Sequence, residues 1–145
     1  MTIQEILMDI KSGRKKKVVL DTDTFNEIDD QYALAYCYVC DKLELAAVHA
    51  APYFNDRSDS FEDGMEKSYN EIKKVLGLIS PDYSTPVFEG SRTTVEVSGC
   101  HVDSPAARNL IDVVKNSDEI VYVLAIGAIT NVISAIMMDP SIKNN

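Results

Sequence analysis

The chain alternates short, continuous apolar runs with longer stretches in which apolar residues recur every three or four positions. Continuous runs are typical of strands buried on both faces, and they predict strands at residues 18–20, 45–51, 86–88 and 120–126. The longer period predicts helices with a buried side, which we expect at residues 60–79, 104–114 and 130–138, after a helical lead over residues 1–17. A further helix is expected at residues 29–43, and because its body is apolar nearly all round, we expect it to be buried between layers. Residues 89–103 show no strong period and are expected to form a polar loop.

This order of elements indicates an α/β fold. Strand and helix alternate four times with connections too long for hairpins, which predicts a mainly parallel sheet with helices on both faces. The length of 145 residues and the absence of repeats or a linker favour a single domain over residues 1–145. Ligands of such open sheets bind beyond the carboxyl ends of the strands. The informative segments should therefore begin at Asp21, Ala51 and Gly127.

Charge and hydropathy narrow the range of partners. Fourteen basic and twenty-three acidic residues give a net charge of −9, which repels phosphate backbones and makes a cation a more natural ligand than a nucleic acid. No apolar run approaches the roughly 20 residues of a membrane span, and the first twenty residues lack the order of a secretory signal. We therefore expect a cytoplasmic protein without a membrane partner.

The cysteines favour a reduced compartment, because Cys37, Cys40 and Cys100 cannot all pair within the chain. Cys37 and Cys40 lie within an apolar run, so buried packing is favoured over a redox role. A zinc site would have to combine them with His49 and His101, and no second pair stands at ligand spacing. His101 is expected to be an exposed loop residue.

Five carboxylates fall within residues 21–30, DTDTFNEIDD. Crowded like charges disfavour one another's ionisation unless a cation neutralises them. Capping of the following helix explains Asp29 and Asp30 but leaves Asp21 and Asp23 without a role. Because all the candidate ligands are hard oxygens, the cluster predicts a site for Ca²⁺, with Mg²⁺ as the alternative.

At these residues the chain resembles the inosine-uridine-preferring nucleoside hydrolase family, in which a strand runs into Asp-x-Asp, a short turn, and Asp-Asp at the head of a helix. Asp23, Asp29 and Asp30 match the motif acids, although residues 24–28 are two residues longer than the family's Pro-Gly-x turn. Residues 126–131, IGAITN, are similar to the family's Gly-Pro-Leu-Thr-Asn segment. The likeness extends from about residue 18 to residue 140.

The resemblance implies a Rossmann-like core and a Ca²⁺-dependent N-ribohydrolase that cleaves the N-glycosidic bond of purine or pyrimidine nucleosides. By this likeness Asp23 is a metal ligand and the base that takes a proton from water. Asp30 is a bidentate ligand, and the backbone carbonyl of Ile126 is a third. Asp29 and Asn55, which follows the second predicted strand, are expected to contact the ribose of a small nucleoside substrate.

Family domains are about twice as long, and their later half supplies another metal-binding aspartate and, in many members, a histidine. The chain therefore resembles an amino-terminal half and is apparently truncated. We expect little or no hydrolase activity from it alone, with its open sheet edge satisfied by a homo-oligomer or by a complementing chain. His101 lies near the place of the family's His-Gly segment, but its surroundings do not match.

Two alternatives stay open at this point. A haloacid-dehalogenase-like phosphatase would use Asp21-x-Asp23 as nucleophile and acid, but Phe25 stands where that pattern has Thr or Val, and Asp29 and Asp30 would be idle. The chain could instead be a non-catalytic metal- or ribose-binding remnant or assembly module. Glycine-rich phosphate loops and the nucleophile elbow Gly-x-Ser-x-Gly are absent from the sequence.

Overall fold

A parallel four-stranded sheet forms the middle layer of the computed structural model, which describes residues 2–144. The strands are β1 (Lys16–Thr22), β2 (Leu43–Ala50), β3 (Val87–Phe88) and β4 (Val121–Ala125), and their order across the sheet is β3-β2-β1-β4. Of the expected lead and the expected domain, residues 1 and 145 lie outside the described range. The central position of β1 brings its carboxyl end between those of β2 and β4.

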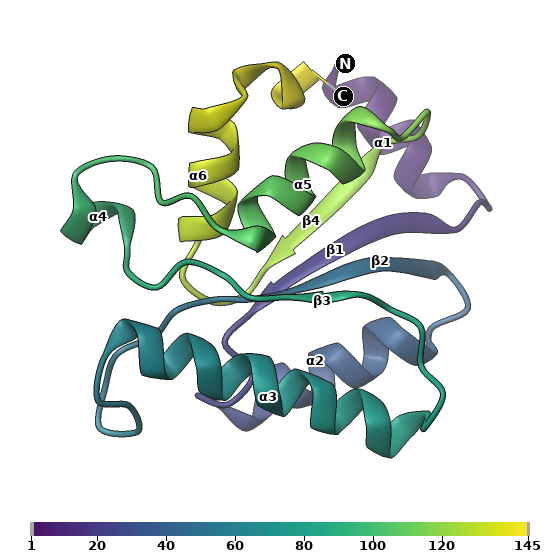
Figure 1. Ribbon diagram of the computed structural model, residues 1–145. Coiled ribbons are helices and arrows are strands. Elements are labelled where there is room, and N and C mark those ends of the chain that lie inside the picture. The colour runs from purple at the N-terminus through teal and green to yellow at the C-terminus, as the bar shows by residue number, and fades with distance from the viewer. Residues whose placement is uncertain (1, 145) are drawn as a thin grey trace.

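Helices cover both faces of the sheet (Figure 1). On one face lie α2 (Ile28–Val39) and α3 (Phe61–Ile79), and on the other lie α5 (Pro105–Lys115) and α6 (Thr130–Met138). The side-chain oxygens of Ser60 and Ser104 accept hydrogen bonds from the first turns of α3 and α5, as N-cap residues do. The α/β class, the parallel sheet and the two helical layers are thus confirmed.

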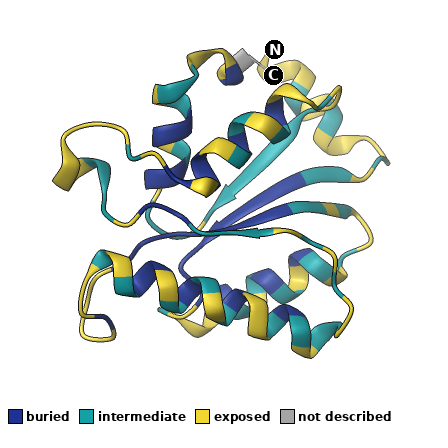
Figure 2. Ribbon diagram, in the orientation of Figure 1, coloured by how far each residue is buried: buried dark blue, intermediate teal, exposed yellow. Residues whose placement is uncertain are grey.

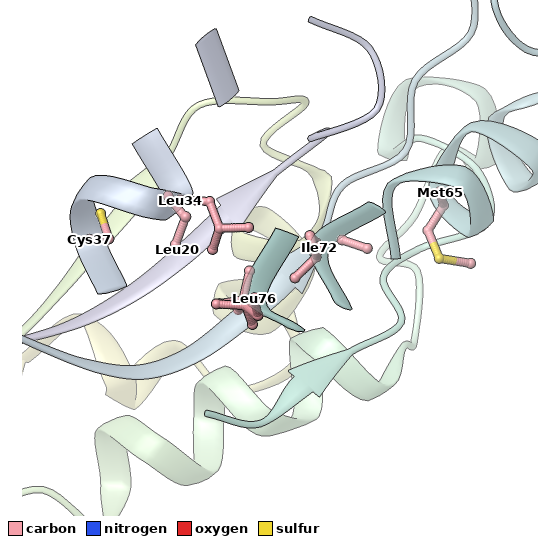
Figure 3. Packing of buried hydrophobic residues seen from close by; sticks show 8 residues of the cluster. Leu20, Leu34, Cys37, Met65, Ile72 and Leu76 are labelled. Carbon is pink, nitrogen blue, oxygen red and sulfur yellow. The ribbon is translucent and has the colours of Figure 1, made fainter. Parts of the chain in front are cut away.

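The core is divided by the sheet, because successive side chains of a strand point to opposite faces. Leu20 belongs to a cluster with residues on the inner sides of α2 and α3. Figure 3 labels it together with Leu34, Cys37, Met65, Ile72 and Leu76. Val19, its neighbour, belongs to the second cluster, with Leu110 of α5 and Ala135 of α6. Burial is concentrated on the strands and on the helix sides that meet them (Figure 2). This explains why the strands read as unbroken apolar runs.

Three shorter elements complete the described chain. The helix α1 (Ile3–Lys11) lies at the amino end of β4, where the Tyr122 hydroxyl donates to Asp9 at 2.7 Å. The 3₁₀ helix η1 (Pro140–Asn144) follows α6. The expected loop at 89–103 contains one helical turn, α4 (Val95–Ser98), so that expectation was wrong in this part: Thr94 caps the turn and Gly99, with φ 70°, ends it.

Two elements begin or end at residues other than those that the sequence predicts. The helix predicted over 29–43 ends at Val39, because Leu43 pairs with Lys16 and opens β2. Likewise β1 begins at Lys16, two residues before its apolar run, and it continues through Thr22. Within residues 2–144, no helix combines the length and the apolar character that crossing a bilayer requires.

Candidate metal and ribose site

The acidic segment lies where the carboxyl ends of three strands meet. The Ile126 N–H donates to the Asp21 carbonyl at 2.9 Å, and the Ala51 N–H donates to the Thr22 carbonyl at 2.8 Å. The ends of β4 and β2 are thereby fixed on either side of β1. The segments predicted to carry the chemistry therefore share one edge of the sheet.

Asp21 is the deepest acid of the cluster and is fully buried at the end of β1. One carboxylate oxygen accepts a hydrogen bond from the Asn131 amide at 2.9 Å, while the other, Oδ1, has no hydrogen-bond partner. Burial raises the pKa of Asp21 to about 7, although the Asn131 hydrogen bond works in the opposite direction. Complete burial argues against Asp21 as a phosphatase nucleophile, which would have to reach its substrate.

Asn131 connects three parts of the site, a role that the sequence motif did not reveal. Its amide also donates to the Ala50 carbonyl at 3.1 Å, and its side-chain oxygen accepts bonds from the backbone and the hydroxyl of Ser91, both at 2.8 Å. Asn131 thus ties α6 to the ends of β1 and β2. The only signal in the sequence was its place after the fourth strand in the segment IGAITN.

His49 is a second buried polar residue that sequence reasoning left without a role. Its Nε2 lies 2.9 Å from the Asn109 side-chain oxygen, whereas its Nδ1 has no hydrogen-bond partner and lies 3.8 Å from Asp21 Oδ2. Burial lowers the pKa of His49 to about 4, so the ring is neutral at pH 7. The contact with Asp21 is therefore not an ion pair at that pH.

Asp23 and Asp30 form the inner wall of the cluster and are only 7% and 6% exposed. The Thr22 hydroxyl donates to Asp30 at 2.5 Å, and the Asn26 amide donates to Asp23 at 2.9 Å. Burial raises the pKa of Asp30 to about 6, with further increases from the charges of Asp23 and Asp29, and burial also raises the pKa of Asp23. Two buried carboxylates whose pKa values are raised would be stabilised in their ionised form by a cation beside them.

Asn26, in the longer turn after β1, connects the first loop to the second. Its side-chain oxygen accepts a hydrogen bond from the Asn55 amide at 2.7 Å while its own amide is bound to Asp23. The Arg57 guanidinium donates to the Asn26 carbonyl, also at 2.7 Å. Asn55 was predicted to contact ribose only from its place in the loop after the second strand. In the structure, Asn26 links it by hydrogen bonds to Asp23, a candidate metal ligand.

The other predicted residues lie at the rim. Asp29 is exposed in the first turn of α2, and Ile126 is 45% exposed at the end of β4. Gly127, which follows, lies so close to the first loop that an added Cβ would be 2.9 Å from Asp23 Oδ1. The structure thus places Asp23, Asp29, Asp30, the Asn55 loop and the end of β4 at one edge of the sheet, and it links Asp23 to Asn55 through Asn26. The individual roles of these residues stay predictions.

The donor set suits a hard cation but is small. Asp23 and Asp30 are buried, and among the described residues no lysine or arginine forms an ion pair with either. The same part of the chain contains no group of three or more histidine, cysteine or acidic side chains arranged to hold a metal. Ca²⁺ takes about six to eight oxygens, so further ligands would have to come from backbone carbonyls, water or substrate.

The cysteines and His101 stand apart from this cluster. Cys37 is buried in the core, where burial raises the pKa of its thiol, as expected of a packing residue. Cys40, for which buried packing was also expected, is only half-buried at the end of α2. Cys100 is exposed and belongs to the loop after α4, as does His101. Neither Cys100 nor His101 lies in the segments that meet at the acidic cluster.

The fold is similar to that of a nucleoside hydrolase of known structure. The chain superposes on a plant nucleoside hydrolase, the PpNRh1 enzyme, with a TM-score of 0.68 over 88% of its own length and 21% sequence identity. The match covers 44% of the plant chain, so this chain spans less than half the length of that protein. No protein-family model and no curated protein sequence matches it. The nucleoside hydrolase-like core is confirmed, and the inosine-uridine-preferring subfamily stays a prediction.

Proposed function

We propose that this chain forms the metal- and ribose-binding part of a nucleoside N-ribohydrolase. One observation carries the proposal: at the carboxyl edge of a nucleoside hydrolase-like sheet, the buried Asp23 and Asp30 lie beside a loop, pinned through Asn26, that presents Asn55. A buried acidic wall next to neutral amides is suited to a sugar hydroxyl and a cation. It is poorly suited to a phosphate.

In this proposal each residue has a defined task. Asp23 accepts the proton of the attacking water, and burial raises its pKa toward the range in which a carboxylate is an effective base. Asp29 and Asn55 hydrogen-bond the ribose hydroxyls and hold the sugar in one orientation. The negative charge of the cluster stabilises the positive charge that develops on the ribose as the N-glycosidic bond breaks.

Asp23, Asp30 and the Ile126 carbonyl would hold Ca²⁺, the cofactor that we propose. When bound there, Ca²⁺ would orient the water and lower its pKa. Because the described residues contain no group of three or more side chains arranged to hold a metal, substrate hydroxyls, water or backbone carbonyls would have to complete the coordination.

Calorimetric titration with CaCl₂ and a nucleoside-cleavage assay test the proposal on the same preparations. We expect one Ca²⁺ per chain in the wild type, strongly weakened binding in Asp23→Asn and Asp30→Asn, and unchanged binding in Asp82→Asn, a matched exposed acid after α3. Inosine and uridine are the first substrates to try. A wild-type chain that neither binds Ca²⁺ nor cleaves a nucleoside would exclude the proposal.

A non-catalytic binding module is the second candidate, and one observation favours it. Among the described residues, no group of three or more histidine, cysteine or acidic side chains is arranged to hold a metal, so this part of the chain offers few side-chain ligands for a catalytic ion. Ca²⁺ and ribose binding without turnover would support this candidate, whereas turnover that is lost in Asp23→Asn would support the hydrolase.

A further inference from the structure

The outer face of α2 carries a row of large apolar side chains that the described part of the chain leaves uncovered. Five residues, 64% to 77% exposed, make up this α2 stripe: Ile28, Tyr32, Tyr36 and Val39 of α2 and Leu78 of α3. Within α2 they are spaced by four, four and three residues, which places them along one side of the helix. Contiguous exposed apolar surface of this kind is uncommon on monomers and marks interaction sites.

The α2 stripe faces away from the sheet. Leu34 and Cys37 are the buried apolar residues of α2, and at about 100° per residue the stripe lies on roughly the opposite side of the helix from them. A helix added beside α2 in the same layer would contact its flanks and leave the stripe open. An element packed on the outer side of α2 and α3 would cover it.

A groove of about 290 Å³ runs between α2 and α3, and Ile28, Tyr32 and Leu78 of the stripe form part of its wall. Its walls are apolar apart from Gln31 and Tyr32, and include Ala35 of α2 with Val75 and Ile79 of α3. A groove next to projecting tyrosines is self-complementary, because two copies related by a two-fold axis can each place a side chain in the groove of the other.

Charge distinguishes a second copy from a charged partner. The chain as a whole carries −9, yet α2 has no acidic or basic residue from Gln31 to its end at Val39. A basic partner would be drawn to the acidic surface elsewhere and would meet no counter-charge on the stripe. An identical uncharged face matches it, and the general repulsion between two acidic chains is screened at physiological salt.

The size of the stripe is close to what a stable dimer needs. Five large side chains about two-thirds exposed offer roughly 700 Å², compared with about 800 Å² per partner in an interface of standard size. We propose that two copies of this chain associate through the α2 stripe about a two-fold axis, with Tyr32 and Tyr36 at the centre. This interface lies on the helical layer, away from the acidic cluster, so it does not depend on the proposed function.

Sedimentation velocity over about 1 to 100 µM chain tests the interface directly. We expect the wild type to dimerise, Tyr32→Glu and Tyr36→Glu to raise the dissociation constant by about 100-fold or more, and Val97→Glu to leave it unchanged. Val97 is the matched control, since it is 67% exposed but lies in α4. Circular dichroism establishes that each variant is folded, which is expected because these side chains project into solvent.

Salt dependence supplies a second measurement. An apolar contact between two acidic chains should tighten, or stay constant, as NaCl rises from about 0.05 to 0.5 M. A wild type that stays monomeric throughout, or a dimer that Val97→Glu breaks as readily as Tyr32→Glu does, overturns the proposal. A dimer that dissociates with added salt overturns it too, because its basis would then be electrostatic.

Discussion

Aspartates lie at both ends of the sheet, but their surroundings are opposite. At the amino end, Asp9 accepts bonds from Arg14 at 2.6 and 2.8 Å and from the Tyr122 hydroxyl, and these donors lower its pKa. At the carboxyl end, Asp21 and Asp30 are buried among neutral donors, and burial raises their pKa values. At the amino end, the charge of Asp9 is paired with Arg14 of the same chain. At the carboxyl end, no lysine or arginine of the described residues pairs with Asp21 or Asp30, so a bound cation could supply the counter-charge.

This contrast separates residues that hold the fold together from residues that are available for chemistry. Ionised carboxylates buried without a counter-charge reduce stability, and strongly perturbed pKa values collect at functional sites. The same residue type therefore serves the fold at one end and, in our proposal, a ligand at the other. Four changes test the contrast.

Replacing the inner acids should have the largest effect. We expect Asp30→Asn to weaken Ca²⁺ binding by about 100-fold or more, because a charged ligand is lost, and to stabilise the metal-free chain by about 1–2 kcal/mol, because a partly screened buried charge is removed. Calorimetric titration and thermal unfolding in EDTA measure the two quantities. A variant that loses stability without metal would contradict the assigned cause of the raised pKa.

The second-largest effect is expected from adding a side chain at Gly127, where the end of β4 approaches the first loop. In Gly127→Ala, the new Cβ would lie 2.9 Å from both Asp23 Oδ1 and the Ala51 Cβ, so we expect a loss of about 1–3 kcal/mol in the free energy of unfolding. Gly77→Ala is the control, because nothing lies within 4 Å of its added Cβ and alanine favours a helix. Denaturant unfolding compares the two, and equal stability would contradict the close approach.

Between pH 5 and 8, the pH dependence of the free energy of unfolding should reflect the buried acids at the carboxyl end of the sheet. Asp21 and Asp30 hold protons up to about pH 7 and 6 in the folded state, whereas they lose them near pH 4 when unfolded. Stability therefore falls as pH rises from 5 to 8. His49, whose pKa is lowered to about 4, acts in the opposite direction below about pH 6.5, but it is one group against two.

Scanning calorimetry in EDTA should accordingly give a Tm lower at pH 8 than at pH 5, by on the order of 5 °C. Added CaCl₂ should raise the Tm more at pH 8, because the ligands must be ionised to bind the metal. A metal-free Tm that rises over this interval would mean that His49, or groups at the amino end, outweigh the buried acids.

The amino end should give the smallest effect and none on metal binding. Asp9→Asn removes the ion pair with Arg14, which is partly solvent-exposed, so a small decrease in Tm is expected at pH 7. Ca²⁺ affinity should stay as in the wild type. A change in affinity would show that the two ends are coupled, which the contrast excludes.

The sequence by itself determined the class of fold and the place of the candidate site. Unbroken apolar strands, amphipathic helices and the caps at Ser60 and Ser104 are local features, and they define the parallel α/β arrangement before any long-range contact is considered. The crowding of acids directly after a strand was equally visible, since it depends on residues adjacent in the chain. Ends such as the change from α2 to β2 were less certain, because Leu43 fits either pattern.

Only the tertiary structure decided which polar groups are buried together and which apolar groups are left outside. His49 meets Asp21, and Asn131 reaches Asp21 across 110 positions of sequence, because parallel pairing and the packing of α6 bring strand ends together. The sequence could not predict the α2 stripe, because a helix that is apolar nearly all round is expected to be buried on every side. Packing covered one side of α2 and left Tyr32 and Tyr36 exposed.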